Sequence, residues 1–88
     1  MTKLEQKLLK LGYEIENTDW TYKTARKWFE YGWFNILFNK EKYGNNIYYS
    51  CVDYIFKFKT QQDIDNLQQA FNQLQADLKE LKKYEKLE

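Results

Sequence analysis

The stretch TQQDIDNLQQAFNQLQADLKELKKYE, residues 60–85, decides the fold, because its apolar residues recur at alternating spacings of three and four. These residues are Ile64, Leu67, Phe71, Leu74, Leu78 and Leu81. The spacing predicts one amphipathic helix with a single apolar stripe. Thr60 is a suitable N-cap, and Asp63 at the N3 position favours the helix dipole. A helix of about 25 residues is about 37 Å long, so it needs an apolar surface of similar length to cover.

A shorter helix is predicted near the beginning of the sequence, before Gly12, which offers a left-handed stop. Its apolar positions, at spacings of four and three, are Leu4, Leu8 and Leu11. A helix this short is unstable alone, so we expect it to pack on the rest of the domain. The connection over residues 13–19 is expected to include a brief extended piece around Tyr13 and Ile15.

The middle of the chain predicts strands. Residues 33–39 alternate, with Phe34, Ile36 and Phe38 on one face. Residues 43–46, Tyr-Gly-Asn-Asn, tolerate positive φ and predict a hairpin turn into a long strand over residues 47–59. In that strand both faces are partly apolar. One face is predicted to hold Tyr48, Val52, Tyr54, Phe56 and Phe58, and the other Ile47, Tyr49, Cys51 and Ile55.

Residues 20–31 carry two competing patterns. From Trp20 the side chains alternate with a period of two, which predicts a strand. Tyr22, Ala25 and Phe29 also fit helical spacing, which predicts a helix from about Tyr22 that Gly32 would end. The choice matters for function, because a helix would remove Arg26 and Trp28 from the sheet.

These elements predict an α+β fold of the order α-β-β-β-α. We expect a three-stranded antiparallel meander packed by a short N-terminal helix and a long C-terminal helix. The 88 residues fit one small domain, residues 1–88. With 43% hydrophobic and 19% aromatic residues, this domain is expected to fold without disulfides or metal.

The composition argues against an enzyme. The sequence has no histidine and one cysteine, Cys51, so the commonest general base and metal ligand is missing. The glycines Gly12, Gly32 and Gly44 are isolated and form no phosphate-binding loop. We therefore expect no catalytic residues, no metal and no cofactor. The lone cysteine and the lack of a signal peptide or membrane-spanning run predict a cytoplasmic protein.

Nucleic-acid binding is one alternative function. Residues 20–59 hold seven basic and three acidic side chains, a local charge of +4 within a chain of net charge +1. Lys23, Arg26 and Lys27 lie near several aromatic residues, and cations among sheet aromatics stack single-stranded bases. The small net charge offers little affinity for phosphates.

Protein association is the favoured function. The helices can cover one sheet face, while the other keeps large apolar side chains that fit a protein partner or a second copy. The residues predicted to contact this partner are Trp28, Trp33 and Tyr49. The stripe of the long helix also fits the a and d positions of a coiled coil, although a helix lying on its own sheet explains it more simply.

Two segments carry a resemblance. The string KLEQKLLKLGY, residues 3–13, and the string QDIDNLQQAFNQLQADL, residues 62–78, together cover about a third of the chain. They resemble small uncharacterised phage and prophage proteins of AT-rich Gram-positive bacteria. The resemblance implies an accessory protein that acts by binding host or phage components, and it implies no particular functional residues.

Overall fold

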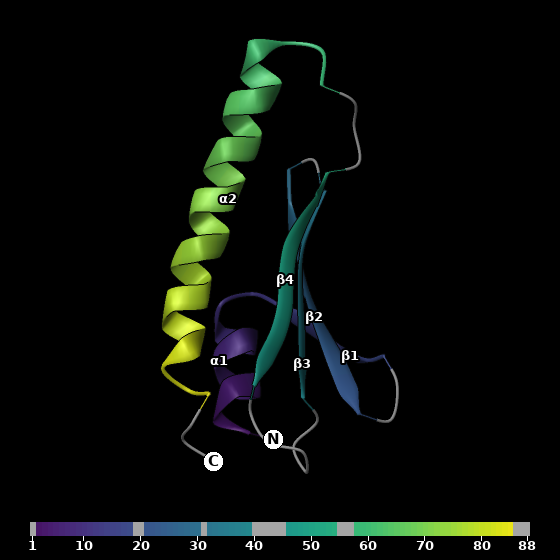
Figure 1. Ribbon diagram of the computed structural model, residues 1–88, viewed down its shortest axis with the longest axis vertical. Coiled ribbons are helices and arrows are strands. Elements are labelled where there is room, and N and C mark those ends of the chain that lie inside the picture. The colour runs from purple at the N-terminus through teal and green to yellow at the C-terminus, as the bar shows by residue number, and fades with distance from the viewer. Residues whose placement is uncertain (1, 19–20, 31, 40–45, 55–57, 86–88) are drawn as a thin grey trace.

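The computed structural model describes residues 2–18, 21–30, 32–39, 46–54 and 58–85. The elements are α1 (Lys3–Lys10), β1 (Glu14–Asn17), β2 (Tyr22–Phe29), β3 (Gly32–Asn39), β4 (Ile47–Tyr54) and α2 (Gln61–Lys82). The strands form one antiparallel sheet in the order β1-β2-β3-β4, so each strand pairs with its neighbour in sequence. Both helices lie on the same face of this sheet (Figure 1). The α+β meander is confirmed.

The sheet has four strands, so the prediction of three was wrong. The extended piece expected around Tyr13 and Ile15 forms a strand of its own, β1, and Ile15 pairs with Ala25 of β2. The ambiguous segment is also settled: Tyr22–Phe29 is a strand, because both of its edges pair, with β1 on one side and β3 on the other. Trp20 and Tyr31 lie outside the described residues.

The end of the predicted long strand is shorter than expected. Strand β4 ends at Tyr54, and residues 55–57 lie outside the described residues. Phe58 and Lys59 lead into α2 without strand structure. Of the predicted turn at residues 43–46, only Asn46 is described, but β3 and β4 pair antiparallel as a hairpin requires.

The predicted start of the long helix is confirmed, whereas α2 ends at Lys82, three residues before the predicted end at residue 85. Thr60 is the N-cap of α2 and forms a reciprocal capping box with Asp63: its side chain accepts from the Asp63 N–H, and the Asp63 carboxylate accepts from the Thr60 N–H at 3.0 Å. Thr2 caps α1 by accepting from the Glu5 N–H at 3.1 Å. Gly12 has φ +94°, the left-handed conformation that glycine adopts without steric cost.

The hydrophobic core lies between the helices and the face of the sheet turned toward them, which we name the inner face. Its fully buried side chains come from both layers: Leu4, Leu8, Ala25, Phe34, Ile36, Phe38 and Leu81. The apolar stripe of α2 joins this core only in part. Leu74 and Leu81 are buried, whereas Ile64 and Phe71 are 50% and 41% exposed. The long dimension of the molecule is correspondingly large, with extents of 45 × 24 × 18 Å.

The two predicted faces of β4 were assigned wrongly at its first residues. The β3–β4 register shifts between Leu37 and Phe38, so Phe38 pairs with Ile47 while Leu37 pairs with Tyr49. This irregularity turns Ile47 toward the core and leaves Tyr48 55% exposed on the opposite face. A register shift of one residue exchanges the two faces of a strand, and the sequence pattern of β4 does not mark it.

The turn between β2 and β3 brings two backbones close together. Gly32 is buried and pairs with Tyr54 of β4. A Cβ at this position would overlap the backbone carbonyl oxygen of Asp53 and would lie 2.8 Å from the ring of Phe29. Only glycine fits here. None of the helices in the described part of the chain is both long and apolar enough to span a membrane.

Candidate functional site

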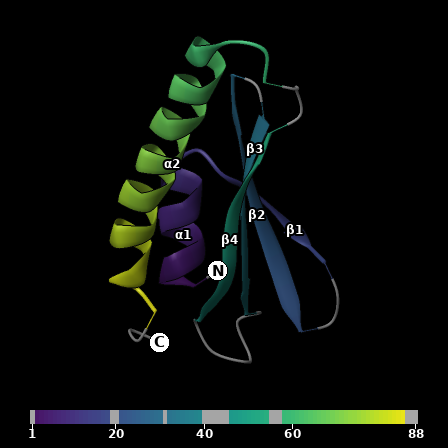
Figure 2. The same cartoon turned by 45° about the horizontal axis from the view of Figure 1, so that its top comes forward.

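The candidate site is the sheet face opposite the helices, which we name the outer face. No helix covers it in either of two views (Figures 1 and 2). Because side chains alternate along a strand, the pairing of Trp28 with Trp33 and of Arg26 with Asn35 places these residues together on the outer face. Leu37 of β3 also lies on the outer face, and it pairs with Tyr49 of β4. Strand β4 is therefore the third strand that contributes to this surface.

An ordered aromatic and cationic group lies at one end of the outer face. The rings of Trp28 and Trp33 meet edge to face, with centroids 4.9 Å apart and an interplanar angle of 69°. The guanidinium carbon of Arg26 lies 4.2 Å from the centre of the Trp33 ring, within the range of a cation–π contact. Trp28 is 48% exposed. These three side chains contact one another, so they present one continuous group to a partner.

A second aromatic group lies at the other end of the same face. Tyr22 and Tyr48 meet edge to face with centroids 5.4 Å apart. The side-chain amide of Asn39 donates to the Tyr48 hydroxyl at 2.9 Å. The sequence prediction of contact residues missed both tyrosines. The alternation from Trp20 did signal Tyr22, whereas Tyr48 reaches this face only through the register shift.

Between the two groups the outer face is hollowed. The hollow has a volume of about 250 Å³ and is lined by Thr24, Asn35, Leu37, Tyr49, Cys51 and Asp53. The side-chain amide of Asn35 donates to Asp53, and the Cys51 thiol contacts the other Asp53 oxygen at 3.5 Å. Partial burial and the nearby Asp53 carboxylate raise the pKa of Cys51. The thiol is therefore held protonated and is a poor nucleophile at neutral pH.

The charge of the outer face is acidic. Glu14, Glu16 and Asp53 are exposed and lie on outer-face positions of β1 and β4, since Glu14 and Glu16 pair with Arg26 and Thr24. Arg26 is the one basic residue among the described outer-face positions of the four strands, and it is engaged with Trp33. The surface thus combines an aromatic centre with carboxylates beside it.

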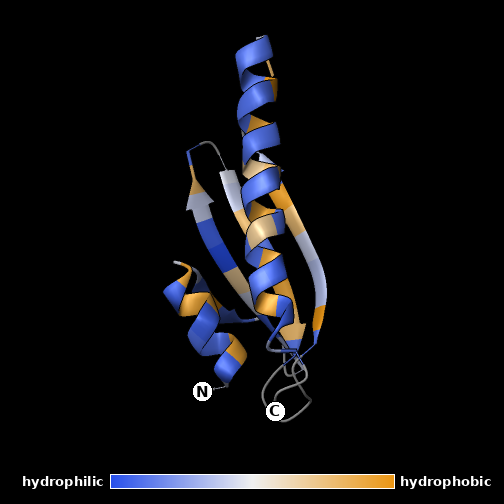
Figure 3. Ribbon diagram, turned by 90° about the vertical axis from the view of Figure 1, so that its left-hand side faces the viewer, coloured by the Kyte–Doolittle hydropathy of each residue, from blue (hydrophilic) through white to orange (hydrophobic). Residues whose placement is uncertain are grey.

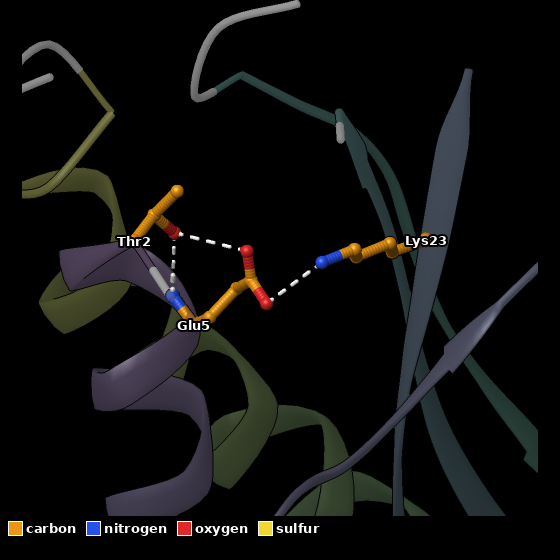
Figure 4. A network of polar contacts seen from close by, with 3 residues as sticks. All are labelled: Thr2, Glu5 and Lys23. Atoms are coloured by element: carbon orange, nitrogen blue, oxygen red, sulfur yellow. Dashed lines mark hydrogen bonds and ion pairs between the residues drawn. The ribbon is translucent and has the colours of Figure 1, made fainter. Parts of the chain in front are cut away.

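Lys23 and Lys27 do not belong to this surface, contrary to their grouping with Arg26 in the sequence prediction. Both lie on the inner face and form ion pairs with the helices. The Lys23 ammonium lies 2.9 Å from the Glu5 carboxylate of α1, which Thr2 also contacts (Figure 4). Glu5 is 5% exposed. This lysine joins β2 to the first helix.

The second lysine joins β2 to α2. The Lys27 ammonium lies 3.0 Å from the Asp77 carboxylate, and the Tyr13 hydroxyl donates to the same carboxylate oxygen at 2.8 Å. The Lys27 ammonium also lies 5.1 Å from the centre of the Tyr13 ring and 5.7 Å from that of Phe34. Because Asp77 is 8% exposed, this polar cluster is part of the core and is not open to a partner.

The buried hydroxyl of Tyr13 makes stability depend on alkaline pH. Burial and then the Asp77 carboxylate raise the pKa of Tyr13 above its ordinary value of 10.0. A raised folded-state pKa means that this contribution is fully present below about pH 10 and is lost as the pH rises further. We expect the unfolding free energy to fall by about 1.4 kcal/mol more between about pH 9 and pH 11 in the wild type than in Tyr13→Phe.

Urea denaturation at the two pH values measures this difference. Comparing the two proteins cancels the titration of the other tyrosines and the lysines, which both retain. An equal fall in both proteins would show that the Tyr13 hydroxyl titrates in the folded state as it does in the unfolded chain.

No metal-ligand cluster of three or more histidine, cysteine, aspartate or glutamate residues is found within the described ranges. No protein-family model, curated protein or solved structure matches this chain. The candidate site therefore rests on the chain's own residues. Four of the six residues predicted to bind a partner, Trp28, Trp33, Tyr49 and Arg26, share the outer face.

Proposed function

We propose that this protein is a small, non-enzymatic interaction module that binds another protein through the outer face of its sheet. The observation that carries the proposal is the ordered group of Trp28, Trp33 and Arg26 on a face that no helix covers. Tryptophan, tyrosine and arginine are the residues that dominate binding energy at protein interfaces. Tyr48 and Tyr49, each 55% exposed, extend the aromatic surface across β4.

The charges of the outer face favour a basic partner. Glu14, Glu16 and Asp53 stand beside the aromatic centre, and complementary charges steer association and select the partner. We therefore propose a partner surface with an apolar centre and lysine or arginine residues around it. A role as a phage or prophage accessory protein agrees with a function by binding, and it stays a proposal based on the resemblance of two segments.

Single-stranded nucleic acid is the weaker candidate. Nucleic-acid binding was predicted to use Lys23, Arg26 and Lys27 on one surface. Lys23 and Lys27, however, form ion pairs with buried carboxylates on the inner face. The exposed carboxylates of the outer face would repel phosphates. Fluorescence anisotropy with a labelled thymidine oligonucleotide tests this candidate. Tight binding that weakens steeply with salt would support it over the protein partner.

Loss of two aromatic side chains is expected to weaken partner binding strongly. The probes are short synthetic peptides that alternate lysine with tryptophan, leucine or valine, and matched peptides with glutamate in place of lysine. We expect the basic peptides to bind more tightly to the wild type. The Trp28→Ala/Tyr49→Ala variant should bind them at least about thirtyfold more weakly, equivalent to about 2 kcal/mol.

Phe58→Ala is the matched control, because Phe58 is as exposed as Trp28, at 48%, but follows the sheet and lies outside the outer face. Isothermal titration gives the affinities, and circular dichroism checks that each variant is folded. Equal affinity for basic and acidic peptides would contradict the choice of partner. Equal loss in the Phe58 variant would contradict the choice of surface.

A further inference from the structure

The last strand of the sheet has an open edge. Strand β4 lies at the end of the sheet order and pairs on one side only, with β3, among the described strands. Edge strands are usually protected by lysine, proline or inward-pointing charges. Residues 47–54 hold neither lysine nor proline, and their one charged residue, Asp53, points to the outer face. The N–H of Ile47, the first residue of the strand, donates to the Glu85 carboxylate at 3.1 Å.

An exposed apolar flank of α2 lies beside this edge. Successive residues of an α-helix are rotated by about 100°. Ala70, Leu74 and Asp77 point to the core, and Asn66, Gln69 and Gln73 border a hollow together with Phe29 at the end of β2. The side of α2 that carries Asn66, Gln69 and Gln73 thus faces the β2 side of the sheet. Ile64 and Phe71 lie on the opposite side of the helix, which faces the β4 side.

The exposure of this flank is unusual for α2. The surface of the helix that faces away from the sheet is mostly hydrophilic (Figure 3). Ile64 and Phe71 are nevertheless 50% and 41% exposed. Among the described elements, the exposed flank of α2 and the outer edge of β4 thus lie on the same side of the molecule.

We propose that a second copy of this chain occupies this side, with the two β4 strands paired antiparallel about a two-fold axis normal to the sheet. Such a dimer has one continuous eight-stranded sheet. The axis keeps both α2 helices on the same face of that sheet and makes them antiparallel, so their apolar flanks face each other. One symmetric contact therefore covers the edge of β4 and the part of the flank around Phe71, as isologous dimers do.

The pairing that centres on Cys51 fits the residues of β4. It places Tyr49 opposite Asp53 of the other copy and Ser50 opposite Val52, so that residues of the same face oppose each other. No like charges meet, whereas a pairing centred on Asp53 would oppose two carboxylates. Like charges directly opposite each other destabilise a strand pair.

The same centre brings the helix flanks together. The hydrogen bond from Ile47 to Glu85 shows that these two residues lie at the same height along the molecule. Cys51 lies about 13 Å further along β4. The same distance along α2 corresponds to about nine residues. The axis therefore passes near residue 76 of α2, between Phe71 and Leu78. Residues 66–76 carry no charge, so the two flanks meet without repulsion. Lys82, lower on the same flank, meets this uncharged part of the other helix.

Multi-angle light scattering across a hundredfold range of concentration tests the proposal on the full chain. We expect the wild type to form a dimer. Cys51→Lys places two ammonium groups opposite each other at the axis, and Phe71→Lys places charge on the flank; each should weaken dimerisation by about a hundredfold or more. Mild oxidation of the wild type should give a Cys51-linked dimer, because paired antiparallel residues lie within disulfide distance.

Matched controls add the same charge elsewhere. Asn35→Lys lies one strand inward, directly beside Cys51, and Asn72→Lys lies on the exposed side of α2, one residue from Phe71. Both should remain dimeric, and circular dichroism identifies any variant that has not folded. A monomer at every concentration overturns the proposal. The edge of β4 would then be available to pair with a strand of another protein. A dimer that Cys51→Lys and Phe71→Lys leave intact overturns it as well.

This test is independent of the proposed function. Since the axis is normal to the sheet, the outer faces of both copies stay uncovered. Trp28 lies on β2, away from the β4 edge, so Trp28→Ala alone tests partner binding by that face without changing the dimer contact. The failure of one proposal therefore does not imply the failure of the other.

Discussion

Replacing Asp77 with alanine is expected to lower the unfolding free energy by about 3–5 kcal/mol. The Asp77 carboxylate accepts from the Lys27 ammonium at 3.0 Å and from the Tyr13 hydroxyl at 2.8 Å. Its removal leaves the Lys27 ammonium, which lies near two aromatic rings, without a counter-charge. It also leaves the buried Tyr13 hydroxyl without its acceptor. Breaking one side of a buried ion pair is among the most destabilising single changes in proteins.

The matched control is Glu80→Ala, three residues further along the same helix. Glu80 pairs with Lys83 at 3.1 Å, but these side chains are 45% and 62% exposed. Its loss should leave stability almost unchanged, because exposed ion pairs contribute little. Adding Lys27→Met to Asp77→Ala should restore part of the lost stability, because the unpaired charge is then gone. Urea denaturation compares the four proteins, and similar effects of Asp77→Ala and Glu80→Ala would contradict a structural role for the buried cluster.

Replacing Gly32 with alanine is expected to cost about 3 kcal/mol or more, although alanine ordinarily stabilises a strand relative to glycine. The added Cβ would overlap the Asp53 carbonyl oxygen and press on the Phe29 ring. A backbone atom cannot rotate away as a side chain can, so the β3–β4 pairing near Tyr54 must open.

Gly12→Ala is the comparison for this second effect. Gly12 has a positive φ, a backbone conformation that is unfavourable for alanine. A Cβ at this position would contact only the Lys27 side chain, at 3.9 Å. The expected cost is about 1–2 kcal/mol. Chemical denaturation should therefore rank Gly32→Ala as the more destabilising variant. The reverse order would show that the β3–β4 contact yields easily to the extra methyl group.

The regular elements of the fold were readable from the sequence because their patterns were long. The helix predicted over residues 60–85 and the strand predicted over residues 33–39 both have clear periods, and the structure contains both, as Gln61–Lys82 and Gly32–Asn39. The fourth strand was not predicted, since Glu14–Asn17 is four residues long and contains a single apolar residue, Ile15. Strand β2 was ambiguous because Tyr22, Ala25 and Phe29 satisfy two periods at once, and only pairing with both neighbours decides between them.

The exposed part of the α2 stripe has a geometric cause. A stripe that repeats every seven residues drifts by about 20° per heptad around a straight helix. Leu74 and Leu81 occupy d positions of the repeat and face the sheet. Ile64 and Phe71 occupy a positions nearer the start of the helix, and they lie on one flank. The sequence shows the apolar stripe, but it does not show how much of the stripe will face the sheet when the helix is straight.

The candidate site was predictable to the extent that it depends on alternation. Arg26 and Trp28 share one parity in β2, while Lys23 and Lys27 have the other. Strict alternation alone would have separated them. The carboxylates that hold the two lysines, Glu5 and Asp77, are brought in by the helices, and no local pattern announces a contact between residues so far apart in the sequence.

The length of α2 affects how the oligomeric state must be measured. The radius of gyration is 13.7 Å, whereas a compact domain of this length has about 12 Å. An elongated particle diffuses more slowly than a sphere of equal mass, so it leaves a size-exclusion column early. A single chain would then elute ahead of a globular standard of its own mass, and calibration by elution volume would overestimate the mass of the chain. Only a measurement of absolute mass separates the hydrodynamic effect of the projecting helix from true association.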